Sequence, residues 1–148
     1  MIKTLGLLLA GLVLTGCGSS TVTSPSVNYS GTWSGTFGTG AVSTVTWTAT
    51  QSGASVTGPA VVVVSGGIVQ FTGTITGTTT SDQLALTISV PAGAIAAVPG
   101  CSISGSGTST VATATSIVAT ITTTFSSACV GTVTTQSTAA AALALTKR

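Results

Sequence analysis

The sequence predicts an all-β domain of eight or nine short antiparallel strands, preceded by an export signal and a tether. Two observations predict the strands. Thr and Val, which are β-branched, dominate the chain, and apolar residues alternate with hydroxyl residues at a period of two. A third observation is the regular return of Gly-containing turns, which is typical of successive hairpins. Such a series either closes into a barrel or splits into a sandwich.

Five strands are expected in the first part of the domain, each with one apolar and one hydroxyl face. Trp33 and Trp47 lie on the apolar faces of the first two, and Phe71 on that of the fourth. Pro59 is expected to interrupt the third strand, because proline cannot donate to a ladder. The expected strands are residues 32–37, 44–50, 55–64, 69–76 and 84–90, with turns at 38–40, 51–54, 65–67 and 77–82.

The second part of the domain continues the alternation after an apolar connection. Residues 91–100 are bounded by prolines and are expected to hold a single helical turn. Further strands are expected at 101–111, 117–125, 129–135 and 142–146, with a turn at 126–128. The run of alanines at 139–142 suits a helix as well as a strand, so the last strand stays open to both interpretations.

The start and the end of this domain favour the barrel over the sandwich. Gly31-Thr32-Trp33 resembles the G-x-W start of calycins, the lipocalin and avidin class of up-and-down β-barrels. Small bacterial lipoproteins with such barrels resemble this chain in a last strand that ends in Lys or Arg, here Lys147 and Arg148. The resemblance covers residues 28–148. It implies that the last strand pairs with the first and that Lys147 lies across Trp33.

Residues 1–16 have the layout of a secretory signal. Lys3 is followed by an apolar stretch, which is shorter than the roughly 20 residues that a membrane-spanning helix needs. Leu14-Thr15-Gly16-Cys17 resembles the lipobox of bacterial lipoproteins, in which the cysteine receives a lipid and becomes the new N-terminus. Residues 17–27 are then a flexible Ser/Thr-rich tether. The alternative is an ordinary secretion signal in which Cys17 is incidental.

The lipobox resemblance implies where the protein is found. The protein would contact a membrane, its partner, through acyl chains such as palmitate. It would be located in the bacterial cell envelope. Gly18 stands where the inner-membrane retention signal of enteric bacteria has Asp, which favours the outer membrane if the host has one.

Charged and catalytic side chains are scarce. The chain contains no His and no Glu, and Asp82 is its only carboxylate side chain. Paired-carboxylate hydrolysis and a Ser-His-Asp triad therefore lack their parts, and a zinc site lacks ligands once Cys17 is lipidated. Three basic residues are too few for electrostatic binding of nucleic acid. We expect no enzyme, no cofactor, no metal and no nucleic-acid partner.

Cys101 and Cys129 remain once Cys17 is assigned to the lipid. Thiols of exported proteins usually pair, so we expect a structural disulfide. A redox-active pair is the alternative, but the chain has no C-x-x-C motif and no base near either thiol.

Two functions from different classes are compatible with these features. The first is a lipid-anchored envelope protein with a non-catalytic structural or surface-interaction role. The second is a lipocalin-like module that holds a small apolar ligand against Trp33, Trp47 and Phe71. A filled barrel favours the first, since eight strands enclose just enough room for side chains, and a cavity lined by these aromatics favours the second.

Overall fold

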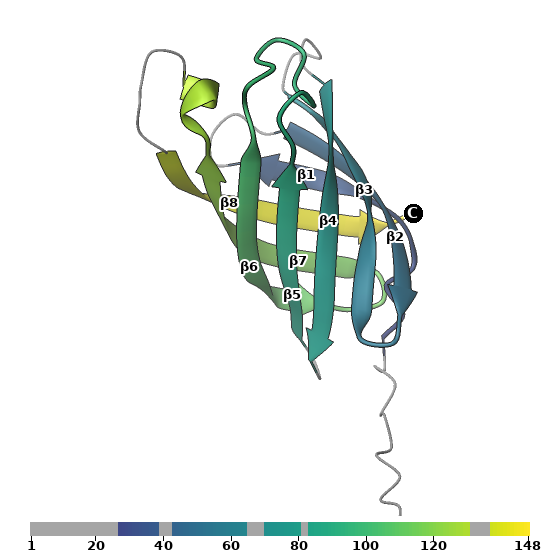
Figure 1. The fold of residues 1–148 in the computed structure, drawn as a ribbon. Helices are drawn as coiled ribbons and strands as arrows, with labels where there is room; N and C mark the ends of the chain where they lie inside the picture. The colour runs from purple at the N-terminus through teal and green to yellow at the C-terminus, as the bar shows by residue number, and fades with distance from the viewer. Residues whose placement is uncertain (1–26, 39–42, 65–69, 81–82, 131–136) are drawn as a thin grey trace, which may run out of the picture.

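The computed structural model describes residues 27–38, 43–64, 70–80, 83–130 and 137–148. Within these residues the strands form one closed antiparallel barrel in chain order, in which each strand pairs with the next and β8 pairs with β1 (Figure 1). The prediction of an all-β up-and-down barrel is confirmed, and the sandwich alternative is wrong. The strands are β1 (Gly31–Gly38), β2 (Ser43–Ser52), β3 (Ser55–Val63), β4 (Gln70–Thr80), β5 (Gln83–Val90), β6 (Ile103–Ala112), β7 (Ser116–Phe125) and β8 (Ser137–Lys147).

The residues that alternate with a period of two in the sequence point alternately into and out of the barrel. In β5, Leu84, Leu86, Ile88 and Val90 are buried while the residues between them are exposed. In β2, Val45, Trp47 and Ala49 are buried between exposed threonines. Because successive side chains of a strand point to opposite faces, the apolar residues gather inside the barrel and hydroxyls cover most of its surface.

Two predictions about the first part of the domain need correction. Residues 77–80 belong to β4, whereas a turn was expected to begin at Gly77. Thr79 explains the longer strand, because its amide and its hydroxyl both donate to the carbonyl oxygen of Ala54. β3 runs through Pro59, and only its ladder with β2 is interrupted, where Thr48 and Ala49 have no partner in β3. The expected turn at 65–67 lies outside the described residues.

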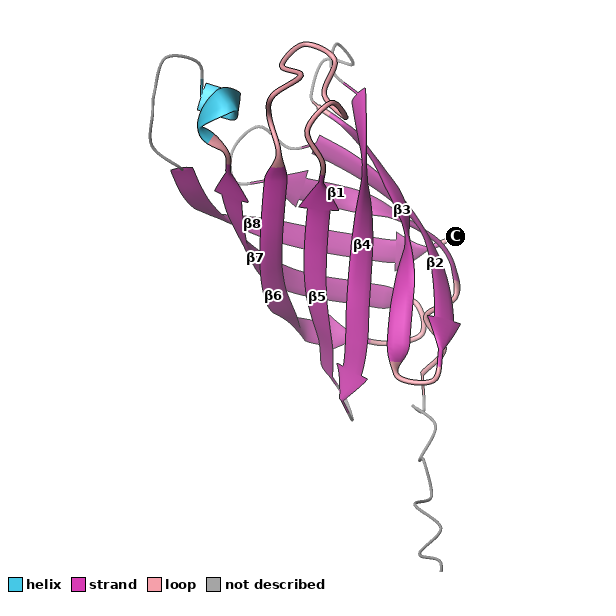
Figure 2. Cartoon of the chain, in the orientation of Figure 1, coloured by secondary structure: helices cyan, strands magenta, loops and turns pink. Residues whose placement is uncertain are grey.

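Two predictions about the second part are also corrected, and the open choice for the alanine run is decided. Ser127–Val130 forms a 3₁₀ helix, η1, where a strand was expected from Cys129 (Figure 2). The rest of that expected strand, 131–135, lies outside the described residues. Residues 91–100 contain turns in place of a helical turn. The alanine run is a strand, because β8 pairs with β1 on one side and with β7 on the other, and these pairings override helix propensity.

Closure of the barrel requires a close approach of β1 and β8. Gly35 lies opposite Leu145, and a Cβ atom on Gly35 would overlap the carbonyl oxygen of Ala144. The same register places Trp33 opposite Lys147. The predicted pairing of the last strand with the first is therefore confirmed, and a glycine at position 35 makes it sterically possible.

Candidate functional site

The two tryptophans predicted to form a ligand wall lie inside a packed core. Trp33 and Trp47 face each other across β1 and β2, and both side chains are 0% exposed. They pack with the other buried residues of the barrel, among them Val56, Leu84, Ile117 and Leu143. In these layers the interior is occupied by side chains, as expected for eight strands.

A small cavity lies between the inward faces of the strands, beside Phe71. Its volume is about 20 Å³, little more than one water molecule needs, whereas pockets for small molecules measure about 300–1,000 Å³. Phe71 lines this cavity, but neither tryptophan does. The structure therefore does not bring the three predicted residues together around one cavity. The described lining is Phe37, Val45, Ala60, Val62, Phe71, Gly73, Thr74, Ile75, Ile88, Val90, Ile103 and Leu143.

The connection from β5 to β6 packs over the neighbouring part of the core. Ile95 and Cys101 form a second apolar cluster with Val90, and Phe71 packs against both this cluster and the main core. Backbone hydrogen bonds organise the connection internally, from Gly93 N to Pro99 O and from Val98 N to Ile95 O. We call this end of the barrel, which carries residues 91–102 and η1, the disulfide end.

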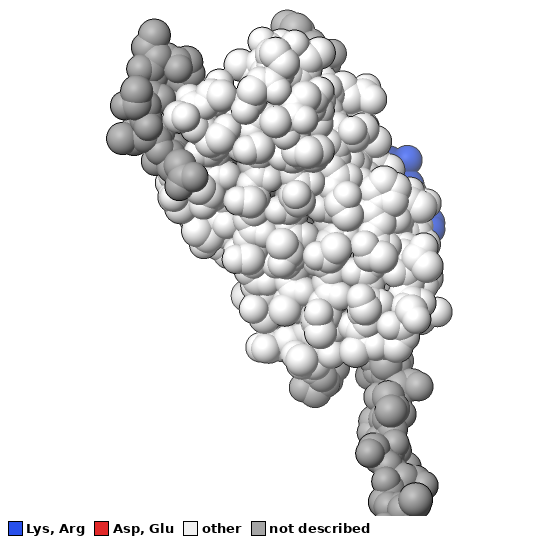
Figure 3. Space-filling view, in the orientation of Figure 1, with Lys and Arg blue, Asp and Glu red and all other residues white. Residues whose placement is uncertain are grey.

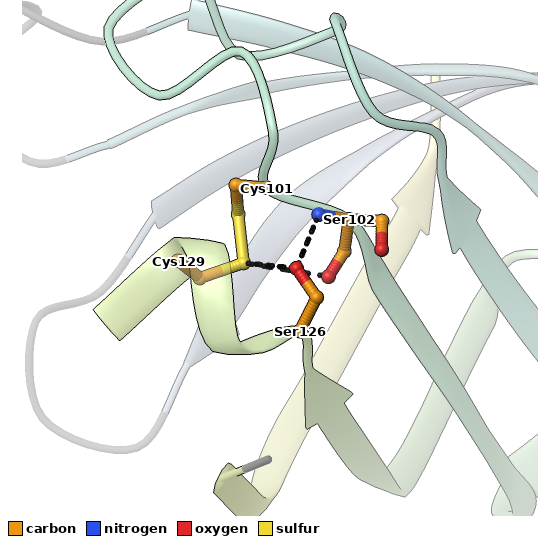
Figure 4. The surroundings of a disulfide bond; sticks show 4 residues. All are labelled: Cys101, Ser102, Ser126 and Cys129. Carbon is orange, nitrogen blue, oxygen red and sulfur yellow. Dashed lines mark hydrogen bonds between the residues drawn. A yellow bond between two sulfur atoms is a disulfide. The ribbon is translucent and has the colours of Figure 1, made fainter. Parts of the chain in front are cut away.

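The predicted disulfide between Cys101 and Cys129 is confirmed, with the two Cα atoms 4.5 Å apart (Figure 4). It joins the end of the β5–β6 connection to η1. Ser126 stands beside it, because its hydroxyl accepts a hydrogen bond from Ser102 N at 3.0 Å and lies 3.4 Å from Cys129 Sγ. The disulfide thus joins the β5–β6 connection to η1, two segments that are separate in sequence and that both lie outside the strands.

The opposite end, which we call the tyrosine end, is covered by residues 27–30. Tyr29 is buried, and its carbonyl oxygen accepts a hydrogen bond from Trp33 Nε1 at 2.8 Å. Lys147 Nζ lies 5.6 Å from the centre of the Trp33 ring and donates to Asn28 O at 3.2 Å. The expected cation–π contact is therefore confirmed. Gly31 has φ of 129°, and a Cβ atom there would lie 2.9 Å from Lys147 Cε.

Gln51 is a residue of this end that the sequence reasoning missed. Its Oε1 accepts from Tyr29 N at 2.6 Å, and its Nε2 donates to the carbonyl oxygens of Val27 and Gly53. Its own amide donates to Ser30 Oγ at 2.9 Å. The only signal in the sequence was a lone amide side chain at the end of a threonine-rich strand. Gln51 thereby links residues 27–30 to the β2–β3 turn.

The indole N–H of Trp47 differs from that of Trp33. It is buried and has no hydrogen-bond partner among the described residues. Leaving a buried donor unpaired costs roughly 1–3 kcal/mol. The interior hydroxyl of Thr123 is paired, since it donates to Ala139 O at 2.8 Å.

The described residues contain little reactive chemistry. No group of three or more His, Cys, Asp or Glu side chains occurs among them, and Asp82 and Cys17 lie outside the described residues. Lys147 and Arg148, at the tyrosine end, are the charged side chains that the structure describes (Figure 3). None of the helices in the described part of the chain is long and apolar enough to cross a membrane.

Comparison with known proteins finds no matching family model, no matching curated protein and no matching solved structure.

Proposed function

We propose that this chain is a lipid-anchored protein of the bacterial cell envelope, with a non-catalytic structural or surface-interaction role. The motif Leu14-Thr15-Gly16-Cys17 after a short apolar stretch supports the anchor. Residue 27 enters the fold at the tyrosine end, where Gln51 binds its carbonyl oxygen. A tether that starts at Cys17 would therefore reach the barrel at this end, and the disulfide end would be the end farther from the point of attachment.

The packing of the barrel interior favours the structural role over the ligand-binding role. The two tryptophans are fully buried among other side chains, and the cavity beside Phe71 has a volume of only about 20 Å³. Since a bound molecule needs more room than this, the part of the barrel that meets partners is its surface. That surface is covered by hydroxyls and is nearly free of charge.

The anchor is tested with Cys17→Ser in a bacterial expression host. The unchanged chain should sediment with membranes and be released by detergent. Cys17→Ser should leave the membrane fraction or keep its signal, because serine cannot form the thioether to the lipid. Ser19→Ala, two residues further on, is the control and should behave like the unchanged chain. Normal processing and membrane retention of Cys17→Ser would refute the anchor.

A second candidate function is the binding of a small apolar molecule at the disulfide end. The specific observation is that the cavity lining is apolar and that Phe71, Val90 and Ile103 connect it to the cluster around Ile95. Movement of the β5–β6 connection would enlarge the cavity without disturbing the tryptophan layers. A ligand there would be apolar, because the lining supplies no charged group to orient a polar one.

This second function is tested by titrating the full chain with a fluorescent apolar probe such as N-phenyl-1-naphthylamine. Saturable binding at micromolar probe that is weakened by Ile95→Ser, but not by the exposed control Ala97→Ser, would place the binding-module function ahead of the structural one. Absence of saturation would leave the structural role as the better account.

A further inference from the structure

An apolar patch interrupts the hydroxyl cover on the outside of the barrel. Val111 of β6 lies directly opposite Val118 of β7, which in turn lies opposite Ala144 of β8. Val111 and Val118 are 42% and 38% exposed, and they are the large apolar side chains that the described part of the chain leaves exposed. Two further outward positions of β8 are also exposed alanines. The apolar patch consists of Val111, Val118, Ala140, Ala142 and Ala144.

A β-bulge in β6 is the reason that Val111 belongs to this patch. The register of β6 with β7 shifts by one residue between Ser109 and Val111. Ser109 is buried, and without the shift Val111, two positions later, would point to the same inward face. The bulge instead aims Val111 outward, opposite Val118, which is a common effect of bulges. The backbone of β6 therefore sets the exposure of this valine pair and distinguishes it from the rest of the surface.

The apolar patch lies beside the end of the barrel at which residue 27 enters the fold. Ala112, which follows the bulge, accepts a hydrogen bond from Tyr29 Oη at 3.3 Å. Lys147 and Arg148 follow the alanines of β8 along the chain. Arg148 extends over the outside of β1, because its Nε donates to Ser34 Oγ at 2.6 Å. The exposed valines and the described cations are thus found together, at the tyrosine end.

The length of chain before the barrel indicates what covers this patch. The roughly ten residues from Cys17 to Val27 span at most about 35 Å, whatever their conformation. A lipid on Cys17 would therefore hold the tyrosine end close to a bilayer and at a high effective concentration, so that a weak contact suffices. A second copy of the chain fits less well, because protein interfaces centre on large aromatic and Arg anchors and the patch is built from Val and Ala.

We propose that the apolar patch docks on the bilayer that holds the lipid of Cys17. Its valines and alanines lie at the boundary between headgroups and acyl chains, and Lys147 and Arg148 lie beside anionic headgroups. The contact is shallow, since valine and alanine are short, and it depends on the tether. The outside of β7 then faces the membrane, and β3, four strands away in either direction, faces away from it. This inference rests on the lipid anchor proposed above and adds the orientation of the barrel.

The orientation can be measured on the full lipidated chain with one fluorophore. The sulfur of Cys17 is occupied by the lipid and Cys101 pairs with Cys129, so an introduced cysteine is the free thiol to be labelled. Ala144→Cys places a nitrobenzoxadiazole label in the patch, whereas Thr57→Cys places it on the outside of β3 near the same end. The chains are reconstituted into vesicles of phosphatidylcholine and phosphatidylglycerol that contain doxyl-labelled lipid, and are isolated by flotation.

The label at position 144 should emit at a shorter wavelength than the label at position 57 and should be quenched by the doxyl lipid, whereas the label at position 57 should not. Quenching at position 144 should weaken on vesicles of phosphatidylcholine alone, because the cations then lose their anionic partners. Equal quenching at position 144 on both kinds of vesicle would refute the contribution of the cations.

Two matched pairs of substitutions test the valines. Val111→Thr with Val118→Thr exchanges two methyl groups for hydroxyls at nearly constant shape, and should lower the equilibrium constant for docking about tenfold and with it the quenching at position 144. Val61→Thr with Val63→Thr makes the same exchange at half-buried positions of β3 and should leave that quenching unchanged. All four positions keep a β-branched side chain, so the strands should be retained.

The outcomes separate this inference from the anchor. Flotation with equal quenching at positions 144 and 57 would refute the docking and leave the anchor standing. Equal loss of quenching in both valine pairs would show that the valines of the patch are not the contact. A shorter emission wavelength without doxyl quenching, increasing with the protein-to-lipid ratio, would assign the patch to a contact between copies of the chain. Chains that do not float with the vesicles would refute the anchor and, with it, the docking that depends on it.

Discussion

At the tyrosine end polar contacts hold the barrel together, whereas at the disulfide end apolar packing and one covalent bond do so. Residues 27–30 are fixed by hydrogen bonds to Gln51, by the Trp33 indole and by the Lys147 ammonium. The β5–β6 connection is fixed by Ile95 in an apolar cluster and by the disulfide to η1. A short segment can therefore cover a barrel end in either way, with side-chain hydrogen bonds to the barrel at the tyrosine end and with apolar contacts and a covalent bond at the disulfide end.

The largest difference between the ends should appear when an aromatic residue is truncated. Trp33→Ala should lower the free energy of unfolding by about 3–5 kcal/mol, because it opens a cavity in a fully buried layer and removes the hydrogen bond to Tyr29 and the contact with Lys147. Phe71→Ala should cost less, since Phe71 is only half-buried and already borders a cavity. Urea unfolding followed by far-UV circular dichroism measures both, and equal losses would contradict the comparison.

Removal of the disulfide should have the next largest effect. Cys101→Ser combined with Cys129→Ser should lower the free energy of unfolding by about 3–4 kcal/mol, because the bridge closes a loop with a sequence separation of 28. The barrel should still form, since both cysteines lie outside the strands. A reducing agent should destabilise the unchanged chain and leave the double variant as it is. An unchanged urea midpoint, or a loss of the β-sheet signal, would refute this assignment.

The smallest effect distinguishes the two indole N–H groups. Trp33→Phe loses a paired donor, whereas Trp47→Phe removes a donor that has no partner among the described residues. The volume change is the same in both, so Trp33→Phe should cost about 1–3 kcal/mol more than Trp47→Phe. The same urea titration, followed by the fluorescence of the remaining tryptophan and by circular dichroism, measures the difference. A cost for Trp47→Phe equal to or above that for Trp33→Phe would show that the Trp47 indole has a partner.

Much of the fold could be predicted because apolar and hydroxyl residues alternate along the sequence of each strand. The inward positions of Trp33, Trp47 and Leu84 follow from the period of two, and Cys101 and Cys129 could be paired because they were the thiols left after Cys17 was assigned to the lipid. The position of η1 could not be predicted in the same way, because Cys129 stands in a Thr- and Val-rich segment that suits a strand. The alanines of β8 were ambiguous for a related reason, since their propensity favours a helix and only strand pairing on both sides makes them a strand.

From the sequence alone it follows that the domain is built of antiparallel strands, that most of them have one apolar face, and that reactive side chains are scarce. The pairing of β8 with β1 was implied by the resemblance alone, whereas the close approach at Gly35, the role of Gln51, the isolation of the Trp47 N–H and the small size of the cavity became visible only in the tertiary structure. The physical reason is distance along the chain. Alternation is a property of neighbouring residues, whereas the contact of Lys147 with Asn28 joins positions 119 residues apart, and its existence depends on the register of every strand between them.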